Sequence, residues 1–99
     1  MAKVCHTYIT TNKNHTVLYV GMTCDLKGRM LKHKQKYYKG FSARYNVDHL
    51  VWYERFDGPL AAIKREKQIK AGSRKQKLEL INAFNPEWKD LAVELLGEG

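Results

Sequence analysis

Five residues of types used in phosphate chemistry stand out in this sequence: two tyrosines, an arginine, a histidine and a glutamate. Tyr8 and Tyr19 lie in two β-rich runs on either side of a short polar stretch, so a hairpin can bring both phenols to one face. Arg29 and His33 are four residues apart in a helical segment and share one face of it. Glu66 is the one acidic residue in a segment that carries seven basic residues.

This set suits metal-assisted chemistry on a phosphate group. A lone carboxylate in a basic field, such as Glu66, is well placed to hold a hard divalent cation that in turn binds phosphate. Each feature also has a plain structural interpretation. The tyrosines can pack across the strands, and Glu66 can form a helix salt bridge with Lys70. The residues alone leave these interpretations open.

The first half of the chain predicts a hairpin followed by a helix. Residues 4–11 and 17–20 are rich in β-formers, and the stretch between them has turn chemistry. Gly21 ends the second strand in this prediction and lets the chain turn sharply out of it. Asp25 then suits the N-cap of a helix that runs to about Gln35.

The second half predicts one strand and three helices. Residues 50–56 read as a strand, and a helix begins near Pro59, with Leu60 on its apolar face, and ends before the glycine at position 72. A capping box formed by Ser73 and Gln76 starts the next helix. A short amphipathic helix follows near the C-terminus.

This order, β-β-α-β-α-α with a short C-terminal helix, predicts an α+β fold: a small three-stranded antiparallel sheet flanked by helices. The length fits a single domain over residues 1–99. No run of 18 apolar residues is present, and the N-terminus lacks the apolar stretch of a signal peptide. We therefore expect a cytoplasmic protein without a membrane partner, in which Cys5 and Cys24 are ordinary reduced residues.

The formal charge of +8 is concentrated in two segments. Residues 25–45 and 64–77 together carry 14 of the 18 Lys and Arg residues, with one acid each. A polyanionic partner explains this clustering better than solubility does. The sign of the charge does not separate nucleic acid from an anionic membrane surface.

Together these motifs resemble those of the GIY-YIG nuclease domain over residues 4 to about 96. The HTY at residues 6–8 stands for the first motif and the YVG at residues 19–21 for the second. Arg29, His33 and Glu66 follow at the spacing of the family. The small stand-alone branch shares the LVWYERF-like strand, the REKQIKAGSR stretch and the NPEWKDL ending.

The first motif departs from the family pattern, because His6 and Thr7 replace the expected Gly and Ile. We expect His6 to fill space beside the site. Family members often have a supporting Asn beyond the catalytic Glu, for which Asn82 is the first candidate and Asn85 the alternative.

The resemblance implies hydrolysis of DNA phosphodiester bonds with one divalent ion, Mg²⁺ or Mn²⁺. It assigns Glu66 to the metal and Arg29 to the scissile phosphate. A tyrosinate from Tyr8 or Tyr19 would activate water, and which of the two acts stays open. His33 would orient a phenol or relay its proton.

Aromatic residues interleaved with basic ones at positions 36–45 indicate the kind of substrate. Such rings stack on unpaired bases while the cations follow the backbone. We therefore expect single-stranded or branched DNA to be favoured over plain duplex. The predicted nucleic-acid-binding residues are Lys32, Lys36, Tyr37, Tyr38, Lys39, Arg44, Lys67, Lys70 and Arg74.

Two other functions fit the same residues. One is a nucleic-acid-binding module with weak or lost catalysis, which the altered first motif would favour. The other is an accessory subunit in DNA repair that docks through its acidic C-terminal helix, with Trp88, Leu91 and Leu95 as the contact stripe. These three residues are more simply core residues, and we expect a monomer.

Overall fold

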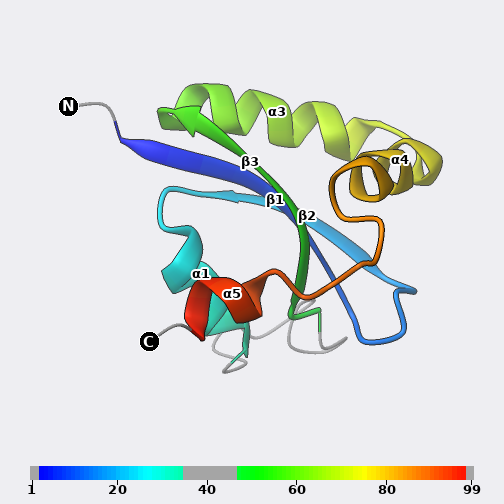
Figure 1. Cartoon of the computed structure of the whole chain (residues 1–99). Coiled ribbons are helices and arrows are strands. Elements are labelled where there is room, and N and C mark those ends of the chain that lie inside the picture. The colour runs from blue at the N-terminus through cyan, green and yellow to red at the C-terminus, as the bar shows by residue number, and fades with distance from the viewer. Residues whose placement is uncertain (1–2, 35–46, 98–99) are drawn as a thin grey trace.

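The computed structural model of the chain describes residues 3–34 and 47–97 (Figure 1). A three-stranded antiparallel sheet lies at its centre. The strands are β1 (Val4–Thr11), β2 (Leu18–Thr23) and β3 (His49–Asp57), in the spatial order β2-β1-β3. This confirms the predicted α+β fold. Five predicted nucleic-acid-binding residues lie outside the described residues, namely Lys36, Tyr37, Tyr38, Lys39 and Arg44.

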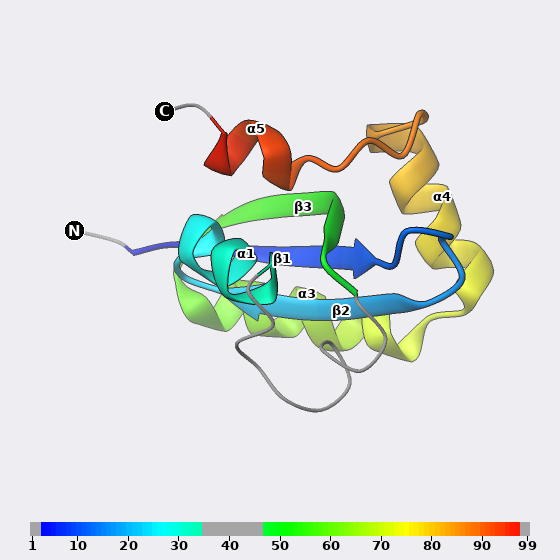
Figure 2. The same ribbon diagram turned by 90° about the horizontal axis from the view of Figure 1, so that it is seen from below.

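Helices pack on both faces of the sheet, and Figures 1 and 2 show how they divide between the two. α1 (Leu26–Lys34) and the short α5 (Ala92–Leu96) lie on one face. α3 (Pro59–Ala71) lies on the other, and α4 (Arg74–Phe84) packs beside it at the end of the sheet. Because side chains alternate along a strand, successive residues of β1 face different helices.

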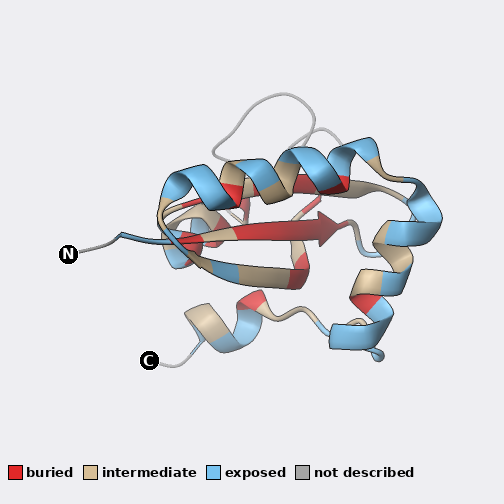
Figure 3. Cartoon of the chain, turned by 90° about the horizontal axis from the view of Figure 1, so that it is seen from above, coloured by how far each residue is buried: buried red, intermediate tan, exposed pale blue. Residues whose placement is uncertain are grey.

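The alternation on β1 produces two core clusters. Ile9 and its neighbours Trp52 and Ile69 pack on the α3 side. Tyr8 packs on the α1 side together with Met30. Figure 3 shows that β1 is almost entirely buried, whereas the outer surface of α3 is exposed. The central strand β1 therefore contributes side chains to the core on both faces of the sheet.

Asp90 fixes the C-terminal segment against the sheet and α1. Its Oδ1 accepts the backbone N–H groups of Leu50 at 3.0 Å and Ala92 at 3.1 Å. Its other oxygen pairs with Lys34 at the end of α1. These contacts hold α1 at its C-terminal end, next to His33.

Most predicted boundaries are confirmed to within a few residues, and the capping box of Ser73 and Gln76 is present. Two predictions are wrong. Gly21 does not end β2, because the strand continues to Thr23 and pairs Gly21 with Tyr8. Leu60 is not on the buried face of α3: it is 81% exposed, and Ala62 and Ile69 are the buried residues.

The expectation of two unpaired cysteines is also wrong, because Cys5 and Cys24 form a disulfide. The register of the hairpin explains the pairing. His6 lies opposite Thr23, so the next residues outward also face each other: Cys5 on β1 and Cys24 directly after β2. Sequence reasoning missed this because the two cysteines form no short motif.

Among the described helices, none has the length and apolar composition needed to cross a membrane.

Candidate active site

The hairpin brings the two tyrosines together on the α1 face of the sheet. Tyr8 lies opposite Gly21, and Tyr19 lies opposite Thr10, so the tyrosines are diagonal neighbours on one face. Their ring centroids are 6.5 Å apart. Tyr8 is fully buried and Tyr19 is half-buried, so the pair extends from the core to the edge strand.

α1 adds the arginine and the histidine to this pair. The helix begins after Asp25, whose Oδ1 accepts the N–H of Gly28 at 3.1 Å. Arg29 Nη1 donates to the Tyr8 hydroxyl at 3.3 Å. The His33 ring is 6.2 Å from that of Tyr8 and 6.1 Å from that of Tyr19. The three rings therefore form a triangle, with the guanidinium on one phenol.

Gly21 makes room for this arrangement. A Cβ atom at position 21 would lie 2.5 Å from the Tyr8 hydroxyl oxygen and 2.6 Å from the carbon that carries it. Any side chain here would push the Tyr8 ring away from β2. Gly21 thus leaves the space that the Tyr8 ring occupies, and it does so inside β2 and not at a sharp turn.

His33 is buried beneath α1, with only 6% of its surface exposed. Burial is the main cause that lowers the pKa of His33, and the Arg29 charge lowers it further. The Asp48 carboxylate acts in the opposite direction and raises the pKa. The lowered pKa favours the neutral imidazole, which can accept a proton. Asp48 was not foreseen as part of this site, since it lies far from His33 in the sequence.

His6 lies two residues before Tyr8 on the same face of β1. Its ring contacts Tyr53 edge to face at 5.7 Å, and its buried Nδ1 has no hydrogen-bond partner among the described residues. Burial and the Arg55 charge lower its pKa. This packing is compatible with the space-filling role expected for His6.

Glu66 lies on α3, on the face of the sheet opposite to α1. Its side chain is 18% exposed and forms an ion pair with Lys70 at 2.9 Å, the helix salt bridge anticipated from the sequence. A carboxylate that is largely shielded yet retains access to solvent fits a hard divalent ion. Within residues 3–34 and 47–97 no three His, Cys, Asp or Glu side chains cluster as a metal site. An ion held by Glu66 would complete its shell with water and phosphate oxygens, as Mg²⁺ commonly does.

The two asparagines considered as supporting residues hold the C-terminal segment. Asn82 Oδ1 accepts the indole N–H of Trp88 at 2.7 Å. The buried Asn85 Nδ2 donates to the carbonyl oxygens of Val51 at 3.2 Å and Lys89 at 2.9 Å. The described contacts do not bring either one into the tyrosine cluster.

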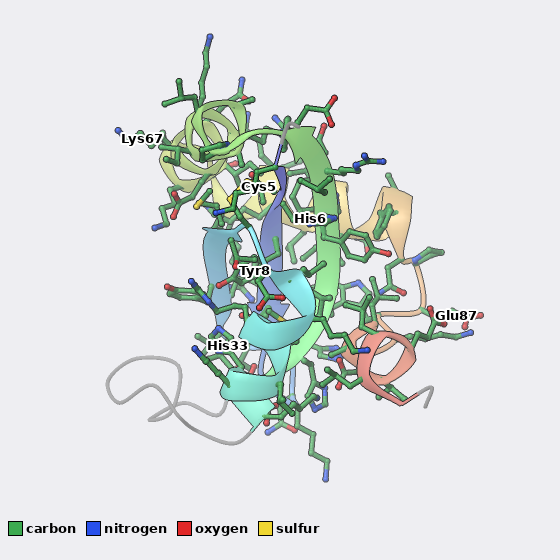
Figure 4. The ribbon with its side chains drawn as sticks, turned by 90° about the vertical axis from the view of Figure 1, so that its left-hand side faces the viewer. Cys5, His6, Tyr8, His33, Lys67 and Glu87 are labelled. Atoms are coloured by element: carbon green, nitrogen blue, oxygen red, sulfur yellow. A yellow bond between two sulfur atoms is a disulfide. The ribbon has the colours of Figure 1, made fainter. Side chains whose placement is uncertain are left out.

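The described basic residues flank the site from different elements. Lys32 is exposed on α1, and Lys67 and Lys70 are exposed on α3. Figure 4 shows Lys67 and His33 on the same side of the molecule, on α3 and α1 respectively. Arg74 begins α4, where its Nη2 donates to the carbonyl oxygen of His15 at 3.4 Å, so it lies by the hairpin turn.

The sheet and the tyrosine-arginine-histidine cluster define the class of nuclease domain that the sequence resembles. The sequence profile of the GIY-YIG catalytic domain matches residues 4–79. The chain belongs to the GIY-YIG family of nucleases.

Similar proteins share the name UPF0213. One from Staphylococcus saprophyticus is 37% identical over 65 residues, which cover 66% of this chain and 79% of that protein. One from Staphylococcus aureus is 37% identical over 68 residues, covering 65% and 78% of the two chains. The solution structure of a UPF0213 protein from Bacillus halodurans matches with a TM-score of 0.56 at 23% identity, over 91% of this chain and 95% of that one. At that identity the likeness shows the fold.

Proposed function

We propose that this protein is a metal-dependent endonuclease that hydrolyses phosphodiester bonds of DNA. The observation that carries the proposal is the contact of Arg29 with the Tyr8 hydroxyl inside the triangle of Tyr8, Tyr19 and His33. A purely structural tyrosine pair does not need a permanent cation on its hydroxyl. A catalytic tyrosine does need one, because the cation stabilises the phenolate and can then bind the phosphate.

The residues of the cluster divide the work of the reaction. Tyr8 or Tyr19, as a tyrosinate, would take a proton from the attacking water. Neutral His33 would accept or relay the phenol proton. Arg29 would stabilise the phenolate and bind the scissile phosphate as a charged fork.

Glu66 is the residue that would hold the divalent ion, Mg²⁺ or Mn²⁺. When bound, that ion supplies charge stabilisation of the phosphate oxygens and of the leaving oxygen. Glu66 itself has two tasks that this chain can perform. It would present its carboxylate from α3, and its ion pair with Lys70 would give way where the carboxylate holds the ion.

We propose single-stranded or branched DNA as the favoured substrate and a single-domain monomer as the active form. The support is the interleaving of aromatic and basic residues at positions 36–45, together with Lys32 on α1 and Lys67 and Lys70 on α3. Stacking on unpaired bases requires bases that a duplex does not offer. Arg74, at the hairpin turn, would contact the same backbone further along.

A cleavage assay tests the proposed function. Wild type, Glu66→Ala and the control Glu87→Ala are incubated with matched single-stranded, duplex and branched DNA, in Mg²⁺, in Mn²⁺ and with chelator. Glu87 is an exposed carboxylate on the C-terminal segment that pairs only with Lys89 among the described residues. We expect metal-dependent cutting by wild type and Glu87→Ala, and its loss with retained DNA binding in Glu66→Ala.

Two other results would each redirect the proposal. If wild type binds every substrate but cuts none, the protein is a nucleic-acid-binding module, and the altered first motif at His6 and Thr7 is the place to look for the lost chemistry. If duplex is cut faster than the matching single strand, the substrate preference is wrong while the nuclease proposal stands.

A further inference from the structure

Thr7 makes a buried hydrogen bond that the function described above does not use. It lies on β1 directly before Tyr8, and its side chain faces α3. Its fully buried hydroxyl donates to the backbone carbonyl oxygen of Ala62 at 2.7 Å, across 55 residues of sequence. A buried hydrogen bond of 2.7 Å holds β1 and α3 in one specific position relative to each other.

The acceptor lies one helical turn before Glu66. In an α-helix the carbonyl of Ala62 also accepts the N–H of the residue four positions later, which here is Glu66. A carbonyl oxygen has two lone pairs, so it can serve both donors. The Thr7 hydroxyl therefore donates to the same carbonyl oxygen that accepts the backbone N–H of Glu66, the candidate metal ligand.

The rest of the contact between α3 and the sheet is less specific. Ala62 and Ile69, the buried residues of α3, make apolar contacts, which are non-directional and tolerate small shifts. Among the described residues, another polar link joins α3 to the sheet: Arg65 Nε donates to Glu54 Oε1 at 3.0 Å, and this contact is partly exposed and lies on β3. The Thr7 bond is a buried, directional restraint in the N-terminal part of the helix.

We propose that Thr7 is a positioning residue that sets Glu66 on α3 in register with Tyr8 on β1. This inference rests on the proposed function, because it assigns both residues to one reaction. Neighbouring positions of one strand then hold the two halves of the site: Tyr8 enters the aromatic cluster, and Thr7 fixes the helix behind the sheet. The family motif has an isoleucine at this position, and an isoleucine has no hydroxyl to make this bond.

The test removes the hydroxyl without changing the shape of the side chain. Thr7→Val is the test variant, and Thr7→Ser is the conservative variant that keeps the hydroxyl. Thr10→Val is the matched control, since Thr10 is equally buried on the same strand and its hydroxyl has no partner among the described residues. If Thr7→Val fails to fold, Thr7→Ala compared with Thr7→Ser gives the same comparison.

A misplacement of about 1 Å can cost about 100-fold in rate. We therefore expect Thr7→Val to lower kcat by about 10- to 100-fold and to raise the metal concentration at half-maximal rate. KM for DNA should change by less than about threefold. Thr7→Ser and Thr10→Val should retain the wild-type kcat. If Thr7 were only structural, Thr7→Val would lower Tm but would neither lower kcat at nearly constant KM nor shift the metal dependence.

A second readout does not depend on cleavage. Amide hydrogen exchange of the apo protein should be faster at Glu66 and the neighbouring amides of α3 in Thr7→Val, and unchanged in Thr10→Val. Unchanged exchange and unchanged kcat in Thr7→Val would overturn the inference. If wild type cuts no DNA, the proposed function fails, and the exchange result alone decides whether Thr7 anchors α3.

Discussion

Gly21 shows how a single hydrogen atom in place of a side chain determines the geometry of the site. In Gly21→Ala the added Cβ meets the Tyr8 hydroxyl at 2.5 Å, so the ring must move and its contact with Arg29 must break. We expect a loss of about 1–3 kcal/mol in the free energy of unfolding, typical of overpacking, and a larger loss of activity than of stability. Denaturant unfolding and the cleavage assay measure the two. Unchanged values for both would show that Tyr8 is not held against Gly21.

His33 makes the stability of the protein depend on pH. Burial and Arg29 lower its pKa from 6.5, so the unfolded chain takes up this proton before the folded one. Stability is therefore fully present above pH 6.5 and is lost as the pH falls toward the pKa of the folded state. His6 acts in the same direction, because its pKa is lowered by burial and by Arg55.

Thermal unfolding between pH 8 and pH 5 tests this assignment. Wild type should lose stability on acidification, and His33→Gln should show a shallower loss than wild type. His33→Gln with His6→Gln should be shallower still, whereas His15→Gln, an exposed histidine, serves as the control. An equally steep loss in the double variant would assign the pH dependence to other groups.

At the scale of elements, the disulfide connects the strand of Tyr8 to the start of the helix that carries Arg29. Cys24 directly precedes the N-cap Asp25, and its partner Cys5 is 19 residues away in sequence. Closing a loop of about this length is worth about 3 kcal/mol in the chain-entropy model. We expect a reductant to lower Tm in wild type and to leave Tm unchanged in the double variant Cys5→Ser with Cys24→Ser. Equal sensitivity of both proteins would mean that the disulfide does not stabilise the fold.

Elements with local signals were predictable from the sequence. The capping box of Ser73 and Gln76 and the N-cap Asp25 involve neighbouring residues, and both are present. The meeting of Tyr8 with Tyr19 followed from the hairpin. Leu60 was misplaced because the helix of positions 59–71 is apolar on more than one side, and only packing against the sheet selects Ala62 and Ile69. Thr7 was noted only as a departure, since its partner is 55 residues away.

The whole molecule carries a net charge of +8, and many of its described basic residues lie on α1 and on α3, at opposite faces of the sheet. A DNA strand that reaches Arg29 from one face and Glu66 from the other must pass an edge of the sheet, since β1 is central. We expect it to pass β2, because this edge strand carries Tyr19 of the cluster. Lys67 on α3 would then contact the backbone beside the site. Lys89, on the acidic C-terminal segment, would not.

Salt titrations of DNA binding measure this path. Each phosphate contact with a single strand adds about 0.7 to the slope of log K against log salt. We expect Lys67→Ala to weaken binding and to reduce that slope by about 0.7, and Lys89→Ala to leave both unchanged. An unchanged slope in Lys67→Ala would mean that DNA does not cross this side of α3. Lys32 on α1 would then be the next residue to replace.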